Sequence, residues 1–454
     1  MHLKTITASV LAVTFAASSA LASVPEEVAA RLGEDLTPMG SERAGNAAGT
    51  IPEWTGGLDT VPANVSYDPG GILPNPFPDD EVLFTINASN MGQYSDNLMP
   101  GYQAMMQRYP DSFEMNVYET RRTCAYPDFV YEANARNARV GELVGGGNGI
   151  SEGIMGAPFP IPSAGLEQVW DHTLRYRSYA LTRQFAAAPV TPGGDYTMLT
   201  VQDEAILMWS SPDAQRAEDL NNISIYYIAN TISPARAAGS VILVHEAING
   251  SIQPRQAWQY SPGTRRVRRA PNIAYDNPGT NSDGLSTSDS FDGYNGAPDR
   301  FDWRMVGKSE EFIAMNTYDA QSVSYDELIQ PGHLNQDHVR YELHRVWTVE
   351  ATLRANTRHV YSRRVKHFGE DSHGLALSEL YDARGELWRV QELHTLQYYH
   401  VPLCGSGGEF VYDLQNGRYL ALALRNEEPP VDYFAEQLTP DRYTPSVIRR
   451  LGTR

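Results

Sequence analysis

The sequence has few basic residues, few cysteines and no long apolar run beyond its N-terminus. Its 36 Lys and Arg are outnumbered by 55 Asp and Glu, which gives a formal net charge of −19. Nucleic acids and anionic membrane surfaces attract proteins with a basic surface, so this balance argues against both as partners. No segment after the N-terminus approaches the roughly 20 apolar residues that a membrane-spanning helix needs.

The first 22 residues are typical of a cleaved export signal. Lys4 supplies a positive flank, residues 6–19 form a short apolar stretch, and residues 20–22 (Ala-Leu-Ala) form a small-residue cleavage site. The residue directly after that site is Ser23 and not a cysteine, so we do not expect a lipoprotein. We therefore expect an exported protein whose mature chain begins at Ser23, with an uncleaved anchor as the alternative.

Cysteine occurs only twice, at Cys124 and Cys404. Neither residue has the spacing of a metal ligand set, and an oxidising compartment favours disulfide formation. We therefore predict a bridge between them, with two separate buried thiols as the alternative. In the chain-entropy model, closing so long a loop contributes on the order of 5 kcal/mol at most.

The sequence is rich in long alternating strands between residues 336 and 424. In residues 338–353 the odd positions are mainly apolar and the even positions mainly polar, which predicts a strand with one buried and one wet face. Residues 382–385 (Asp-Ala-Arg-Gly) and Asn416-Gly417 are hairpin signals that separate further strands. Long antiparallel strands twist, so a sheet of this size must curl.

The chain divides into three parts and a tail. Residues 23–95 are rich in proline and glycine and predict an extended N-terminal segment. We expect a single domain over residues 96–430, with helices in residues 96–176 and strands in residues 196–424. Residues 431–454 form a C-terminal tail.

Within the domain, apolar periodicity predicts helices at residues 96–108, 128–140 and 164–176. A short helix is expected at residues 308–316, and residues 277–299 form a long polar loop. Helices followed by strands indicate an α+β protein, in which helices cover one side of a large curved antiparallel sheet.

Five segments carry a resemblance to the domain-of-unknown-function 1329 family: residues 116–138, 156–178, 341–364, 380–392 and 412–428. The resemblance covers nearly all of the mature chain. It implies a periplasmic protein with a fold similar to the lipoprotein carriers LolA and LolB, in which an incomplete β-barrel covered by helices holds acyl chains. It also implies partners among exporters of the resistance-nodulation-division type. The family has no established catalytic residues, and many members lack a cysteine at the position of Cys124.

Charged and aromatic side chains on two predicted strands are the candidate ligand residues: Tyr341, Arg345, Trp347, Trp388, Glu392, His394 and Tyr398. A charge on an apolar face needs a partner, because desolvation without pairing costs several kcal/mol. We expect Arg345 to pair with a carboxylate, Glu392 first of all, or with the backbone. The alternative is that Arg345 and Glu392 hold the polar end of a ligand inside an apolar cavity.

Residues 265–269 (Arg-Arg-Val-Arg-Arg) form a basic island after the turn signal Pro262-Gly263. We expect cross-strand ion pairs between these arginines and the abundant acids. The alternatives are docking to an acidic partner and binding of an anionic headgroup.

Metal chemistry has weak support in the sequence. Histidines are frequent between His333 and His400, but no His-Glu-x-x-His occurs and no strand carries an alternating histidine pair, so we predict no zinc site. Asp289, Asp292 and Asp299 suggest calcium but lack the spacing of an EF-hand. We predict neither a metal nor a cofactor.

These observations predict a carrier of a hydrophobic or amphipathic molecule, serving an envelope export system. Tyrosine occurs 26 times, and aromatic rings with a polar tip suit a cavity that binds apolar chains. The expected partners are that small molecule and an inner-membrane exporter or an outer-membrane protein. One alternative is a hydrolase or lyase acting on envelope lipid or polysaccharide, with Glu392 and His394 as acid and base. The other is a non-catalytic structural component of an envelope assembly.

Overall fold

The computed structural model describes residues 24–270, 273 and 275–453. The expected export signal, residues 1–22, lies outside the described residues. A helix with the length and apolar character needed to cross a membrane is absent from those described ranges.

The strands of the first half of the chain are β1 (Phe84–Ile86), β2 (Met115–Val117), β3 (Glu142–Val144), β4 (Gly149–Ser151), β5 (Ala180–Val190), β6 (Leu199–Leu207), β7 (Ile223–Ser233), β8 (Val241–Ala247), β9 (Gln256–Ser261) and β10 (Arg266–Arg269). The strands of the second half are β11 (Phe301–Ala314), β12 (Tyr341–Leu353), β13 (Arg363–Gly369), β14 (Leu375–Tyr381), β15 (Leu387–Tyr398), β16 (Leu403–Asp413) and β17 (Tyr419–Leu424). The α-helices are α1 (Glu26–Ala29), α2 (Pro100–Arg108), α3 (Asp128–Val140), α4 (Gly165–Leu174), α5 (Tyr318–Ser322), α6 (Tyr325–Leu328) and α7 (Pro445–Leu451).

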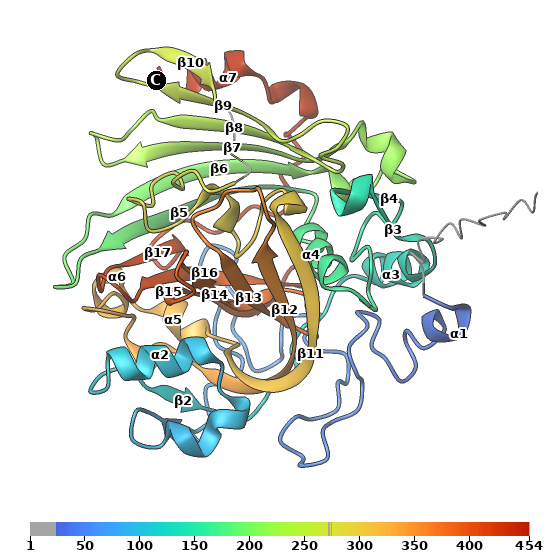
Figure 1. The fold of residues 1–454 in the computed structure, drawn as a ribbon, viewed down its shortest axis with the longest axis vertical. Helices are drawn as coiled ribbons and strands as arrows, with labels where there is room; N and C mark the ends of the chain where they lie inside the picture. Colours follow the sequence, from blue (N-terminus) through green and yellow to red (C-terminus); the bar gives the residue numbers. More distant parts are fainter. Residues whose placement is uncertain (1–23, 271–272, 274, 454) are drawn as a thin grey trace, which may run out of the picture.

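One curved sheet organises the molecule (Figure 1). In the described part of the chain it has fifteen strands in the order β1-β2-β12-β13-β14-β15-β16-β17-β5-β6-β7-β8-β9-β10, with β11 paired to β12. Its neighbours are antiparallel, except that β2 meets β12 in parallel. The order does not close on itself among the described residues, so the sheet is open. This is the curved, helix-covered α+β sheet that the sequence predicts.

The predicted hairpin turns are confirmed. Gly385 joins β14 to β15 and Gly417 joins β16 to β17, and both have positive φ angles, 79° and 73°. Positive φ costs glycine little because it has no Cβ, which explains why glycine stands at these two positions. The backbone N–H of Gly417 donates to the carbonyl of Asp413 at 2.9 Å and closes the second turn.

The helix expected at residues 308–316 is wrong. Those residues belong mostly to β11, which pairs antiparallel with β12 from Phe301 to Ala314. The segment contains Glu310 and Glu311, which favour helices, but long pairing with β12 overrides this local preference. The helix at residues 128–140 is confirmed as α3, and the one expected from residue 96 begins as an α-helix only at Pro100.

The wet face expected on β12 is also wrong for the first half of that strand. Glu342 is 0% exposed and His344 is buried. The N-terminal part of the chain covers this end, and the backbone N–H of Arg121 donates to Glu342 at 2.9 Å. Arg340 donates to the same carboxylate at 2.5 Å, so its charge is paired.

Covering layers pack against both faces of the sheet. Residues of α2, α5 and α6 join the largest apolar cluster together with Leu377, Val390 and Phe410 of the sheet. The other face packs against α4 and against residues 275–300, which we call the crossing segment. Its Leu285 contacts the sheet near β17, and its Tyr294 contacts the sheet near α4. The middle strands are therefore buried on both sides.

Cys124 and Cys404 form a disulfide in the structure. The bond ties the segment before α3 to β16, across 280 positions of sequence. Both residues are buried, so the bridge lies inside the main cluster rather than on the surface.

Candidate ligand cavity

A cavity of about 270 Å³ lies between the concave face of β5–β8, the ends of β16 and β17, and the crossing segment. Successive side chains of a strand face opposite sides, so alternate residues of each strand point into the cavity. Its strand walls consist of Leu181, Arg183 and Phe185 of β5, Val201, Ala205 and Leu207 of β6, Ile225, Tyr227 and Ala229 of β7, and Ile242, Val244 and Glu246 of β8. Most of this surface is apolar.

The rest of the lining comes from the far half of the chain. Leu420 and Leu422 of β17 extend the apolar wall, and Glu409 of β16 adds a carboxyl group. The crossing segment supplies Phe291 and Asp292. The cavity is thus assembled from strands that are more than 200 positions apart, which are brought together by the pairing of β17 with β5.

Five of the described arginines line this cavity, and four of them contact carboxylates. Arg183 makes a bidentate pair with Asp203, with contacts from 2.9 to 3.0 Å, and Arg255 pairs with Glu246 at 2.5 Å. Bidentate geometry makes the Arg183–Asp203 pair strong and fixes the plane of that guanidinium. These two arginines are therefore occupied by the protein itself.

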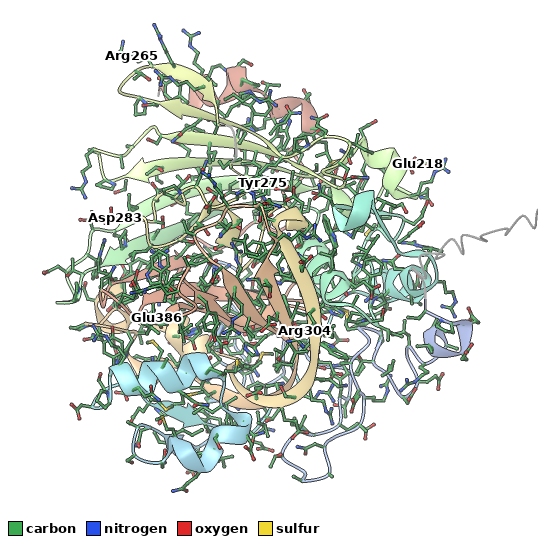
Figure 2. All side chains as sticks on the ribbon, viewed as in Figure 1. Glu218, Arg265, Tyr275, Asp283, Arg304 and Glu386 are labelled. Carbon is green, nitrogen blue, oxygen red and sulfur yellow. A yellow bond between two sulfur atoms is a disulfide. The ribbon has the colours of Figure 1, made fainter. Side chains whose placement is uncertain are left out.

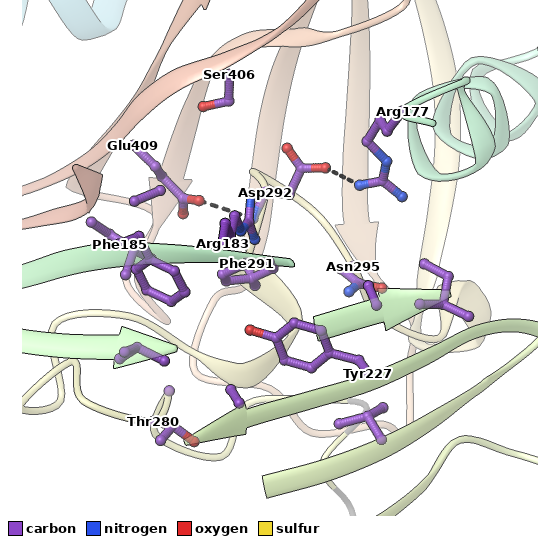
Figure 3. Close-up of a pocket in the computed structure, with 18 of the residues that line it drawn as sticks. Arg177, Arg183, Phe185, Tyr227, Thr280, Phe291, Asp292, Asn295, Ser406 and Glu409 are labelled. Carbon is purple, nitrogen blue, oxygen red and sulfur yellow. Dashed lines mark hydrogen bonds and ion pairs between the residues drawn. The ribbon is translucent and has the colours of Figure 1, made fainter. Parts of the chain in front are cut away.

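Asp292 of the crossing segment contacts two further arginines with its single carboxylate. It contacts Arg175 at 2.8 Å and Arg177 at 2.6 Å, and Figure 3 shows it between Arg177 and Glu409. Burial would raise the pKa of Asp292, but the charges of Arg175 and Arg177 outweigh burial and hold it below its ordinary value. Burial lowers the pKa of Arg177 to about 10. Asp292 and Arg177 are therefore both ionised at neutral pH.

Glu409 differs from the other carboxyl groups. It accepts hydrogen bonds from the backbone N–H of Asp292 at 2.9 Å and from Nε2 of Gln391 at 2.6 Å. Burial, and then the charge of Asp292, raise the pKa of Glu409 to about 8. The side chain is therefore mostly protonated at neutral pH and adds no full negative charge to the cavity.

Arg425 is the remaining arginine of the cavity lining. Its partners are two tyrosines, Tyr398 and Tyr433, and one backbone carbonyl, that of Ser406. No carboxylate within the described ranges lies within ion-pair distance of it.

The structure places the sequence-predicted ligand residues in different surroundings. Tyr398 lines the cavity. Trp347 is half-buried beneath Lys308, whose Nζ lies 5.2 Å from the ring centre. Trp388 donates from Nε1 to Asp413 at 2.9 Å, outside the cavity.

Glu392 lies in the apolar core and not in the cavity. It accepts a hydrogen bond from the hydroxyl of Tyr102 at 2.8 Å, and the hydroxyls of Tyr341 and Tyr412 lie at 3.2 and 3.4 Å. Burial, followed by the charge of Glu392, raises the pKa values of these phenols, so they remain donors. His394 lies 3.7 Å from the same carboxylate.

The predicted pair between Arg345 and Glu392 is not formed. Arg345 donates instead to the backbone carbonyl of Ala44 at 3.0 Å and lies 3.6 Å from the carboxylate of Glu42. The expectation of a carboxylate partner is confirmed, but its identity is wrong. The N-terminal segment, which the alternation of β12 does not reveal, supplies that partner.

The aspartates that suggested calcium have protein partners. Asp289 pairs with Arg364 at 2.6 Å, Asp292 pairs with two arginines as described above, and Asp299 accepts from the hydroxyl of Tyr275 at 3.0 Å. Across the described part of the chain, no group of three or more His, Cys, Asp or Glu side chains is placed to hold a metal ion.

The basic island lies on the hairpin of β9 and β10, at the outer edge of the sheet. Arg265 projects outward there in Figure 2. The expected cross-strand ion pairs are not formed: in the described residues, no carboxylate pairs with an arginine of this island. Packed beside it, α7 adds two exposed arginines. The basic edge consists of Arg265, Arg266, Arg268, Arg269, Arg449 and Arg450.

The open curved sheet, its helical cover and its one-sided cavity define an α+β protein of the incomplete-barrel class. The chain belongs to the family described as "Protein of unknown function (DUF1329)", whose sequence model matches residues 85–449. This agrees with the resemblance drawn from the five sequence segments.

Relatives and solved structures were also found. An uncharacterized protein of Pseudomonas aeruginosa, PA3922, is 45% identical over 447 residues, which is 98% of each chain. A putative outer membrane lipoprotein-sorting protein domain from Vibrio parahaemolyticus aligns at 12% identity and a TM-score of 0.44, covering 63% of this chain and 98% of its own. A DUF1329 family protein from Desulfovibrio piger aligns at 14% identity and a TM-score of 0.42, covering 60% and 92%. Both TM-scores are below 0.5, so no function is inferred from these two structures. The functional conclusion rests on the cavity of this protein.

Proposed function

We propose that the protein is a periplasmic carrier that binds one hydrophobic or amphipathic, lipid-like molecule in the cavity beneath the crossing segment. The observation that carries this proposal is the lining itself, which combines apolar residues from six strands with several charged groups. Such a lining suits a chain with a polar end, because sugars need many more hydrogen-bonding groups. The volume of about 270 Å³ is close to the lower end of small-molecule sites, roughly 300–1,000 Å³.

We expect binding without a covalent step, because the residues considered as acid and base, Glu392 and His394, lie in the core and not in the cavity lining. Glu392 is 0% exposed and is surrounded by tyrosines, away from the cavity lining. A substrate could not reach it without unpacking the core. Affinity would come from apolar burial, at about 25 cal/mol per Å².

Export to the periplasm is supported by two features of the chain. The N-terminal residues have the pattern of a cleaved signal, and the disulfide between Cys124 and Cys404 suits an oxidising compartment.

Delivery or release requires a partner, and the basic edge supports one. Its arginines are exposed and free of carboxylate partners in the described residues, in a chain whose net charge is −19. A surface of this kind favours an acidic face on a partner protein. An exporter of the resistance-nodulation-division type or an outer-membrane protein would supply that face.

The test is binding by the mature protein purified from periplasm. Organic extracts are examined by mass spectrometry, and a fluorescent fatty acid is titrated and displaced. We expect a copurifying lipid and saturable binding by wild type. Ala205→Trp places an indole in the cavity and should weaken binding at least about tenfold with little change in melting temperature. Ala235→Trp, at an exposed turn, is the matched control.

Two results would contradict the proposal of a carrier that binds its ligand in this cavity. One is a folded wild-type protein that shows no saturable binding and no copurifying lipid, which would favour a structural component of the envelope. The other is equal binding by wild type and Ala205→Trp, which would place the ligand elsewhere on the molecule.

A further inference from the structure

Arg425 is held in place by tyrosines. It follows the last residue of β17, and its Nη1 donates to the hydroxyl of Tyr433 at 3.3 Å. Its Nη2 donates to the hydroxyl of Tyr398 and lies 3.4 Å from the carbonyl of Ser406. The guanidinium also lies 5.0 Å from the centre of the Tyr398 ring. These contacts fix the position of the cation but do not neutralise it.

Among the described residues, the charge of Arg425 has no counterion. No carboxylate of the described ranges is within 4.0 Å of it. Burial would lower the pKa of Arg425, but Tyr398 and Tyr433 raise it above its ordinary value, so the side chain stays charged. A half-buried cation without a counterion is costly, and an anion brought by a ligand would offset that cost.

The other arginines of the cavity already contact carboxylates. Arg183 is paired with Asp203, Arg255 is paired with Glu246, and Asp292 holds the remaining two. Glu409 is mostly protonated at neutral pH and does not oppose an incoming anion. Arg425 is therefore the arginine of the described lining that has no carboxylate contact, and an anionic group of a ligand would supply one.

Hydrogen-bond donors are also left over at this position. Within the described residues, Nε of Arg425 has no acceptor, and the hydroxyl of Tyr433 accepts from Arg425 but donates to no partner. Each of these two donors can bind one oxygen of an acid group. The apolar walls begin nearby, at Leu403 and Leu422.

We propose that Arg425, with Tyr433, binds the acidic headgroup of the ligand, so that the cavity takes a single-chain amphiphile with a carboxylate head rather than a neutral lipid. The assignment deepens the proposed carrier function and rests on it. The apolar tail would lie along β5–β7, and the head would lie between the end of β17 and the C-terminal segment that carries Tyr433.

The test compares two probes that differ only in the head. Palmitic acid and cetyl alcohol are used to displace a fluorescent fatty acid from the delipidated mature protein. We expect wild type to prefer the acid at least about tenfold, which is the range of a charge-assisted hydrogen-bonded contact. Arg425→Met should lower the affinity for the acid to that for the alcohol and leave the affinity for the alcohol unchanged. Arg425→Lys should retain part of the preference.

Arg384→Gln is the matched control, because this arginine is exposed at the turn between β14 and β15 and its loss changes the net charge equally. It should bind both probes as wild type does. If Arg425→Met does not fold, as judged by its thermal melt, the preference of wild type and the response of Arg425→Lys decide the question.

The outcomes separate the two proposals. Wild type that binds neither probe contradicts the carrier function itself. Wild type that binds acid and alcohol equally leaves the carrier function standing and overturns the role of Arg425. A preference for the acid that survives unchanged in Arg425→Met would also overturn it, and would assign the headgroup to another arginine.

Discussion

The hydroxyl of Tyr102 donates a hydrogen bond of 2.8 Å to the carboxylate of Glu392, and so fastens α2 to the middle strand β15 of the sheet. Glu392 has no arginine or lysine partner among the described residues. Instead, phenol hydroxyls donate to this fully buried carboxylate, and a histidine lies nearby. This arrangement makes Glu392 a residue that stabilises the core rather than one that contacts the proposed ligand.

Replacing Glu392 by Ala should destabilise the protein without changing ligand affinity. The hydroxyls of Tyr102 and Tyr412 would lose their acceptor, and each unsatisfied buried group costs about 1–3 kcal/mol. The hydroxyl of Tyr341 would keep Oε1 of Gln336, at 2.9 Å, as its acceptor. We expect the free energy of unfolding to fall by roughly 3–5 kcal/mol in urea titrations. Glu392→Gln keeps one acceptor oxygen and should cost less.

The affinity measurement is made on the folded fraction of the same variants. Unchanged displacement of a fluorescent fatty acid is expected for both. A variant that keeps its stability but loses binding would show that Glu392 contacts the ligand, as the sequence alone had suggested.

Removing the disulfide should lower stability while leaving the cavity intact. The bridge between Cys124 and Cys404 closes a long loop, and removal of such a link costs about 2–5 kcal/mol. The double variant Cys124→Ala and Cys404→Ala should unfold at lower urea, and wild type in reductant should match it. Equal stability of variant and wild type would contradict this expectation. Non-reducing peptide mapping checks that the bridge is present.

Local sequence signals account for much of the sheet but little of the cavity. The turns at Gly385 and Gly417 were predictable, because glycine with positive φ is a requirement of the hairpin itself. The strand β11 was not, since its state is set by pairing with β12 rather than by its own preference. The sequence around Arg425 does not indicate a ligand contact either. Whether this arginine has a counterion depends on contacts between segments that are distant in the sequence.

The partner of Arg345 illustrates the same limit. The alternation of β12 correctly predicted that Arg345 lies where its charge needs a carboxylate partner. Which carboxylate lies there depends on the path of the N-terminal segment, and this brings Glu42 rather than Glu392 to within 3.6 Å. Of the seven ligand candidates, Tyr398 lines the cavity. The signal that would have pointed to the lining residues on β5–β8 was the period-two apolar pattern of those strands.

Stability should depend on the protonation of Glu409. Its pKa is raised from 4.5 to about 8 in the folded state, so between these values the folded protein keeps a proton that the unfolded chain has lost. The free energy of unfolding therefore falls as pH rises through this window, by at most about 1.4 kcal/mol per pH unit. Glu409→Gln removes this dependence.

The groups that face Glu409 are Asp292 on the crossing segment, Lys366 on β13 and Gln391 on β15. They are unchanged in the variant, so the difference between the two proteins isolates Glu409. We expect Glu409→Gln to be more stable than wild type at pH 8–9, on the order of 2–4 kcal/mol, and nearly equal at pH 5. Glu386→Gln, at an exposed turn, is the control. A gain that does not change with pH would exclude the titration of Glu409 as its cause.

Reversing charge on the basic edge should abolish partner docking and spare ligand binding. The double variant Arg266→Glu and Arg268→Glu changes two exposed side chains of β10 that have no ion pair in the described part of the chain, so folding should be affected by no more than about 0.5 kcal/mol. An acidic partner would be repelled rather than attracted.

Crosslinking in intact cells, with a photoreactive residue at position 265, should therefore capture an envelope protein with the wild-type edge and lose it with the variant. Arg354→Glu, on an exposed turn elsewhere, is the control for charge reversal away from the basic edge and should retain the crosslink. Capture that is equal in all three proteins, or that depends on anionic lipid instead of protein, would overturn the proposed acidic partner.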